Sequence, residues 1–380
     1  MLKTPVEIEQ FLPFGEMLRS FLQQSTVPKG DLVQVLRSRG VFTASSEKDS
    51  TIPILVSTLL SPDEFEKLRL TCSRKEDTPK INTQTIPWQS DVSLIEAFPE
   101  NLWSGLEQEF EFANYKLTKA SNVTTIDGNE DHVKVDFEIE RTDTSKSWSE
   151  TTSVFPGSIV LKKILEGDKV RLVISYTAPE TQKVAKKALS SVVKHFKNNG
   201  HVNHDDSVDK VLFSSFSNAE RVAFLLALTS ELASDVLEFR EIIDISISPV
   251  ATEDMPESMY WIEEQIRDLR LRGRELQNTK ILRDADCHEF VQLHSIVASF
   301  AFDVRGATGA CRISVAFPKF VSKGDLNSEL EVKVEDVHPE SMGKDTNTST
   351  LTNLILEEMQ DGVQKLYAVN KETTRLSGAP

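Results

Sequence analysis

The chain has 380 residues, of which 39% are hydrophobic and 27% charged, so it is long enough to fold into two or three domains. The net charge of -16 at pH 7 excludes a protein coated all over by nucleic acid, but it is compatible with a local basic site. Residues 1–80 contain eleven basic and eleven acidic residues, so the acidic excess lies in the rest of the chain.

Cysteine usage and hydropathy indicate the compartment. Cys72, Cys287 and Cys311 are far apart and odd in number, which argues against a disulfide framework and favours a reducing compartment. The N-terminus lacks an apolar signal core, and the chain has no run of about 18 apolar residues. We therefore expect a cytoplasmic protein that neither binds nor crosses a membrane.

Residues 1–82 are predicted to form a helical domain, because apolar residues recur at helical spacing over residues 5–75. Ser61-Pro-Asp-Glu64 has the pattern of a helix start, with a serine cap and a glutamate three residues later. The polar segment from Thr78 to Trp88, which contains two prolines, is interpreted as a connection between domains.

Residues 88–200 are predicted to form an α+β domain. Ser104–Asn114 has helical spacing, and Asp127-Gly128 and Glu166-Gly-Asp168 are tight-turn signals. The strongest helix pattern covers Pro179–Lys197, with Lys183, Lys187, Lys194 and Lys197 facing outward. The alternating runs that predict strands are His132–Glu140, Ser158–Ile164 and Lys169–Tyr176.

Residues 205–380 are predicted to form a second α+β domain. Ser217 to Glu220 caps an apolar helix, and Arg305 to Gly309 separates two strand-like runs as a hairpin turn. The predicted helices are Arg221–Leu232, Pro256–Leu276 and Thr350–Tyr367, and the predicted strands are Phe239–Ile247, Val291–Val304, Cys311–Phe317 and Leu330–Val337.

The fold class that follows is α+β, with a helical N-terminal domain and two α+β units whose sheets are mainly antiparallel. Strands followed by a closing helix occur at 132–197 and again at 297–367, which leaves open whether the second unit duplicates the first.

The segment Thr26–Leu60 resembles the SAP-type module, in which a short helix, an extended link and a second helix contact the DNA backbone. A helix through Asp31 would end at Arg-Gly40, and Ile52–Leu60 would form the second helix, although Pro53 lies where that helix should start. A protein-binding three-helix module fits nearly as well. The basic residues that would contact phosphates are Lys29, Arg37, Arg39 and Lys48.

A second basic stripe is predicted on the helix Pro256–Leu276, where Arg267, Arg270 and Arg274 share one face. The stripe would follow phosphates or meet an acidic partner. Alternatively, it is a solvated face paired with Glu263, Glu264 and Asp268 at neighbouring turns.

Two further groups resemble metal or nuclease sites. Glu331-Val-Lys333 places a carboxylate and a lysine on one face of a strand, as in restriction-like nucleases, where Asp303 or Asp325 would supply the second Mg²⁺ ligand. The same residues also fit ordinary strand alternation. The loops His201–Asp206 and Asp284–His288 contain metal-ligand residue types without paired zinc spacing, so we interpret them as polar loops.

Signatures of nucleotide, hydrolase and cysteine chemistry are missing from the sequence. It has no phosphate loop, no dinucleotide glycine fingerprint and no Gly-x-Ser-x-Gly elbow, and Cys287 and His288 are adjacent and point apart. We expect a chain that is not itself an enzyme and has no cofactor.

Several short motifs occur in an order that resembles the non-nuclease subunit of a two-gene bacterial anti-phage defence system, found in gene cassettes next to prophages. The resemblance implies a hetero-oligomeric complex with a nuclease encoded nearby and a role in DNA sensing, with weak DNA binding by the chain alone. It assigns no functional residues. The motifs are Leu32 to Phe42, Ser61 to Phe65, Arg74-Lys-Glu76, Phe216 to Arg221, Trp261 and Gly309-Ala-Cys311.

Overall fold

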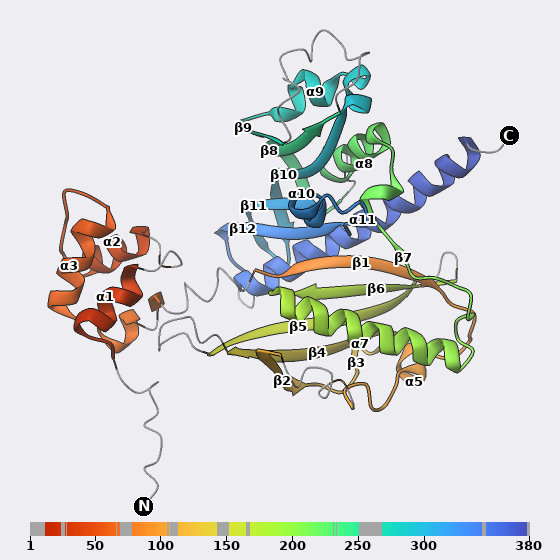
Figure 1. Ribbon diagram of the computed structural model, residues 1–380, viewed down its shortest axis with the longest axis horizontal. Coiled ribbons are helices and arrows are strands. Elements are labelled where there is room, and N and C mark those ends of the chain that lie inside the picture. Colours follow the sequence, from red (N-terminus) through yellow and green to blue (C-terminus); the bar gives the residue numbers. More distant parts are fainter. Residues whose placement is uncertain are drawn as a thin grey trace, which may run out of the picture.

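The computed structural model describes residues 12–23, 27, 29–65, 67–68, 78–104, 106, 113–142, 152–164, 168–230, 232, 234–250, 268–343 and 347–377. The chain begins with a helical head, which has its own apolar core and lies beside a large sheet (Figure 1). Its helices are α1 (Gly15–Gln23), α2 (Lys29–Ser38) and α3 (Lys48–Thr58). None of the described helices is long and apolar enough to cross a bilayer.

The first half of the sheet region ends in one long helix. Its elements are β1 (Lys80–Pro87), α5 (Leu94–Ala97), β2 (Tyr115–Ala120), β3 (Thr124–Ile126), β4 (Asn129–Thr142), β5 (Thr152–Ile164), β6 (Lys169–Tyr176) and α7 (Pro179–Asn198). The predicted strands and the helix at 179–197 are confirmed. Most of the helix predicted at Ser104–Asn114 lies outside the described residues.

The second half ends in another long helix. Its elements are β7 (Asp209–Lys210), η2 (Phe213–Ser215), α8 (Asn218–Ser230), β8 (Leu237–Pro249), β9 (Leu269–Arg272), η4 (Leu276–Asn278), α9 (Lys280–Arg283), η5 (Ala285–Phe290), β10 (Val291–Val304), β11 (Ala307–Ala316), α10 (Pro318–Lys323), β12 (Glu331–Ser341) and α11 (Thr348–Ser377). The helix predicted at Pro256–Leu276 is wrong where it is described, because Leu269–Arg272 is a strand.

All the strands join one antiparallel sheet in the order β2-β4-β5-β6-β1-β12-β11-β10-β8-β9, with β3 and β7 paired at its side. The predicted α+β class is confirmed. The meander β4-β5-β6 leads into α7, and the meander β10-β11-β12 leads into α11, so the arrangement noted in the sequence occurs twice.

The two long helices cover opposite faces of this sheet. On β6, Leu172 and Ile174 belong to the core under α7, whereas Val173 belongs to the core under α11. Arg171, on the same face as Val173, forms an ion pair with Asp361 of α11. Since neighbouring strand residues point to opposite faces, each half of the sheet is packed on a different side (Figure 1).

Strand β1 was missed in the sequence, where it was interpreted as a polar connection. Asn82 and Gln84 are 2% and 5% exposed, so polar residues occupy positions where a strand usually carries apolar ones. The Asn82 amide donates to the carbonyl oxygen of Leu330 at 2.7 Å and accepts from Gln182 Nε2 at 2.9 Å. The predicted domain limits at 82, 88, 200 and 205 remain predictions, although β1 crosses the first of them.

Both predicted capping boxes are present. The Ser61 amide donates to Glu64 Oε2 at 2.8 Å, and the Ser217 amide donates to Glu220 Oε2 at 2.7 Å. The hairpin turns at Asp127-Gly128 and Arg305-Gly306 have positive φ at both residues, as a two-residue hairpin of the favoured twist requires.

Gly309 allows β11 and β12 to approach closely. A Cβ atom added there would lie 2.3 Å from the carbonyl oxygen of His338 and 2.8 Å from the Phe302 ring, beside an irregularity in the strand register. The backbone must therefore shift if any side chain replaces the hydrogen.

We expect Gly309→Ala to lower the free energy of unfolding by about 2 kcal/mol, because the overpacked side chain meets backbone atoms. Urea denaturation followed by circular dichroism measures the loss. Ala310→Ser is the control, since the next residue is partly exposed on the other face and should change stability by less than about 0.5 kcal/mol. Equal stability of both variants would contradict the close approach.

Candidate functional site

The helical head forms the predicted arrangement of helix, extended link and helix. Gly40 has φ +76° at the end of α2, where the Val41 amide donates to the carbonyl oxygen of Leu36 at 2.9 Å and the Gly40 amide to that of Arg37. This is the Schellman ending that the Arg-Gly sequence predicts. The second helix starts at Lys48 rather than at Ile52, and Pro53 lies inside it.

The predicted DNA contacts in the head differ in exposure. Arg37 is exposed at the end of α2 and makes no hydrogen bond or ion pair with the described residues. Lys29 is exposed and lies 2.6 Å from Glu47 Oε1, across the link between α2 and α3. Lys48 is half-buried at the first residue of α3. Arg37 is therefore the position that is most open to a phosphate.

Arg39, one of the predicted phosphate contacts, is held inside the head by other groups. Its side chain is 23% exposed and forms a bidentate ion pair with Glu64. The guanidinium also donates to Thr58 Oγ1 at 2.9 Å and to the carbonyl oxygen of Leu59 at 2.6 Å. The hydrogen bonds from Arg39 hold the pKa of Glu64 down at about 2. Arg39 thus joins α2 to the chain that follows α3, which is a structural role.

The predicted arginine stripe is not on a helix. Arg270 and Arg272 lie on the edge strand β9 and both contact Asp244 of β8, at 2.7 Å and 2.8 Å. Arg274 is exposed beyond the end of β9, and Arg267 lies outside the described residues. One carboxylate therefore pairs with both Arg270 and Arg272. The two arginines share a face because they are two positions apart on a strand, not because of a helical repeat.

Glu331 and Lys333 lie on one face of β12, as predicted, but Glu331 is engaged by other side chains and Asp303 lies at the far end of the strand. Glu331 accepts a hydrogen bond from the Tyr176 hydroxyl and lies 3.6 Å from Lys80 Nζ. In the strand register, Asp303 of β10 is opposite Thr308 of β11, and Thr308 is opposite Ser341 of β12. Ser341 is at the other end of β12 from Glu331, roughly 30 Å along the strand. Asp325 accepts from the Asn327 amide in the turn after α10.

Two histidines of the loops His201–Asp206 and Asp284–His288 contact protein groups of other kinds. The ring of His201 stacks on Trp88 at 5.3 Å and contacts Ser90 Oγ, and burial lowers its pKa. His288 Nε2 lies 3.0 Å from the carbonyl oxygen of Leu282. Over the part of the chain that the structure describes, no three His, Cys, Asp or Glu side chains gather as a metal site would require.

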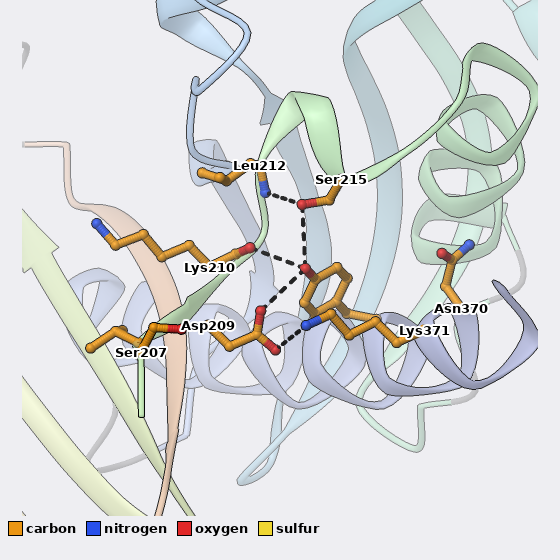
Figure 2. Close-up of a pocket in the computed structure, with 9 residues that line it drawn as sticks. Ser207, Asp209, Lys210, Leu212, Ser215, Asn370 and Lys371 are labelled. Carbon is orange, nitrogen blue, oxygen red and sulfur yellow. Dashed lines mark hydrogen bonds and ion pairs between the residues drawn. The ribbon is translucent and has the colours of Figure 1, made fainter. Parts of the chain in front are cut away.

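A pocket of 460 Å³ lies where the two halves of the sheet region meet (Figure 2). One wall is the link that carries β7 and η2, and the other is the C-terminal part of α11. The lining residues are Ser207, Val208, Asp209, Lys210, Leu212, Ser215, Tyr367, Asn370 and Lys371.

Hydrogen bonds in this junction pocket attach the link to α11. The Tyr367 hydroxyl donates to the carbonyl oxygen of Lys210 at 3.1 Å, and Lys371 Nζ lies 2.6 Å from Asp209 Oδ2. Burial raises the pKa of Tyr367, so its hydroxyl stays protonated near neutral pH and acts as a donor. Asp209 is neutralised by Lys371, and the arrangement suits hydrogen bonding to a polar molecule rather than proton abstraction.

The residues of the junction pocket belong to none of the motifs described above. Asp209 and Tyr367 are 158 positions apart, and neither stands in a motif. The sequence feature nearest to this region is the lysine-rich face of the helix at 179–197, whose residues Lys194 and Lys197 lie close to the link that carries β7.

Comparison with known proteins connects the head to a family. The family described as GAPS4b protein N-terminal domain matches residues 16–78 and is associated with anti-phage defence gene systems. The chain is accordingly similar, over its head, to proteins of gene-cassette defence systems. A comparison with curated protein sequences finds no match.

Solved structures share little with the chain in detail. The di-domain ARO/CYC StfQ from the steffimycin biosynthetic pathway is 11% identical, covering 77% of this chain and 99% of its own, with a TM-score of 0.19. DynU16, a putative protein in the dynemicin biosynthetic locus, is 10% identical over 77% of this chain and 96% of its own, with a TM-score of 0.15. These scores are too low to inform function.

We expect Arg39→Ala to destabilise the head by about 2 kcal/mol, because it removes hydrogen bonds to a carboxylate and to Leu59. Glu64 has a lowered pKa in the folded head, so its stabilising effect is present above about pH 4.5 and is lost as the pH falls toward about 2. Thermal denaturation between pH 2 and 7 measures both effects. Arg37→Ala is the control, and an equal loss in that variant would contradict the assignment.

Proposed function

We propose that this chain is a non-catalytic subunit of a cytoplasmic bacterial anti-phage defence complex, which assembles with a nuclease encoded nearby. The observation that carries the proposal is the match of residues 16–78 to a family associated with anti-phage defence gene systems. The nuclease partner and the DNA contact come from the resemblance and from the basic positions in the head.

The DNA contact is assigned to the head. Arg37 is exposed at the C-terminal end of α2, while Lys29 and Lys48 lie at the first residues of α2 and α3. Cations at such positions attract phosphates without reading the base sequence. The chain carries a net charge of -16, so DNA binding by the isolated chain should be weak and should fall steeply with added salt.

The first test measures DNA binding at low salt with a fluorescent duplex of about 30 base pairs, which is longer than the footprint of a single module. The variant Arg37→Ala with Lys48→Ala should weaken binding and reduce the salt slope by about 2, because two phosphates are no longer neutralised by the head. Arg274→Ala is the matched control on an exposed residue outside the head. If the control weakens binding and the head variant does not, the contact is wrongly placed.

The second test concerns the partner. Co-expression with the neighbouring gene, followed by affinity capture and size exclusion, should yield a stable complex with the nuclease. The head variant should keep this complex while losing DNA affinity. If the complex forms and neither variant changes DNA binding, the chain acts as a scaffold that does not meet DNA.

The third test concerns catalysis. The isolated chain with Mg²⁺ should leave plasmid DNA uncut, because Glu331 is engaged with Tyr176 and Lys80 and Asp303 lies at the far end of β12. Gel electrophoresis of the plasmid provides the measurement. Cleavage that disappears in Glu331→Ala would show that this chain is itself a nuclease.

A further inference from the structure

A second pocket lies next to the junction pocket and shares Val208 and Lys210 with it. It has a volume of 300 Å³ and lies between α7, β1, β6 and the link that carries β7. Its apolar lining is formed by Ile174, Leu189, Val193 and Val208, and its polar lining by Gln84, Lys186, Ser190, Lys194, Lys197 and Lys210. We call it the lysine pocket.

The lysine pocket is positively charged in an acidic chain. Glu329 lies between two of its four lysines, 2.6 Å from Lys186 Nζ and 2.8 Å from Lys210 Nζ. Lys197 donates to the carbonyl oxygens of His204 and Asp206, which carry no full charge. Lys194 is exposed and makes no contact of this kind with the described residues. The pocket lining thus contains four lysines and no acid, and among the described residues only Glu329 forms ion pairs with these lysines.

The link beside the lysine pocket also carries acidic residues, among them Asp206 and Asp209. Asp209 stands in the junction pocket and is paired with Lys371. Figure 2 shows the Lys210 side chain extending away from its own carbonyl oxygen. That oxygen accepts from the Tyr367 hydroxyl, whereas the ammonium donates to Glu329 and lines the lysine pocket. The same residue therefore serves both pockets with different atoms.

Gln84 supplies a second, independent observation. The residue is 5% exposed and lines the lysine pocket, and its side-chain amide makes no hydrogen bond with the described residues. Asn82, two positions earlier on the same face of β1, has both of its amide groups paired. The amide faces the pocket without a protein partner among the described residues, so it is available to hydrogen-bond to a bound molecule.

We propose that the lysine pocket binds a nucleotide. Lys194 and Lys197 attract its phosphates, the apolar wall of Ile174, Leu189 and Val193 packs against its base, and Gln84 hydrogen-bonds to the base or sugar. A pocket of 300 Å³ is at the small end of ligand sites, which favours a mononucleotide over a polymer. The proposal does not depend on DNA contact by the head.

Isothermal titration calorimetry on the full chain tests the proposal with four probes: ATP, inorganic pyrophosphate, adenosine and a short single-stranded oligonucleotide. ATP should bind more tightly than pyrophosphate or adenosine. Lys194→Ala should weaken ATP binding about tenfold, since it removes one charge-assisted contact. Because Lys194 is exposed, this variant should fold, and circular dichroism checks that it does.

Lys183→Ala is the matched control, since Lys183 is exposed on the same helix and does not line the pocket. It should leave ATP binding unchanged. Gln84→Leu should weaken ATP binding while leaving pyrophosphate binding unchanged, because only the base or sugar meets the amide.

Three results would overturn the proposal. One is the absence of heat with ATP at millimolar concentration, and another is an equal effect of Lys194→Ala and Lys183→Ala. The third is binding of the oligonucleotide but not of ATP, abolished in Lys194→Ala and kept in Arg37→Ala, which would identify nucleic-acid phosphates as the ligand.

Discussion

The pairing of β1 with both β6 and β12 joins the two halves of the sheet region into one sheet. Without β1 the two meanders would be separate sheets with open edges, which are unfavourable because their backbone groups lack partners. Only Lys80 and Ile81 pair with β12, so the junction needs further support. The buried amide of Asn82 provides it by linking Leu330 to Gln182 of α7.

This junction also explains where the pockets are. Because α7 and α11 cover opposite faces, the link at 205–217 must cross from one half to the other past the edge of β1. Tyr367 and Lys371 hold that link on α11, and the space beside it becomes the junction pocket and the lysine pocket. Several lysines of α7 lie beside this space, although the protein as a whole is acidic.

Two of the motifs behind the family resemblance have structural explanations, whereas Arg74-Lys-Glu76 and Trp261 lie outside the described residues. Ser217 and Glu220 cap α8, and the Arg221 guanidinium lies 3.4 Å over the Phe213 ring and donates to the carbonyl oxygens of Phe213 and Phe216. Gly309 permits the approach of two strands. Ser217, Glu220, Arg221 and Gly309 maintain the fold, and the proposed functions rest on Arg37 in the head and on the lysines beside β1.

Elements whose burial follows a simple period, such as β6, β10 and α7, can be predicted from local sequence, as can caps that need only nearby residues, such as Ser61 and Glu64. Tertiary structure decided the rest. Strand β1 has no apolar alternation in its sequence, because the buried positions 82 and 84 are occupied by Asn82 and Gln84. Leu269–Arg272 is a strand because it pairs with β8, where Asp244 contacts both of its arginines. The two pockets bring together residues more than a hundred positions apart, and no local pattern encodes such contacts.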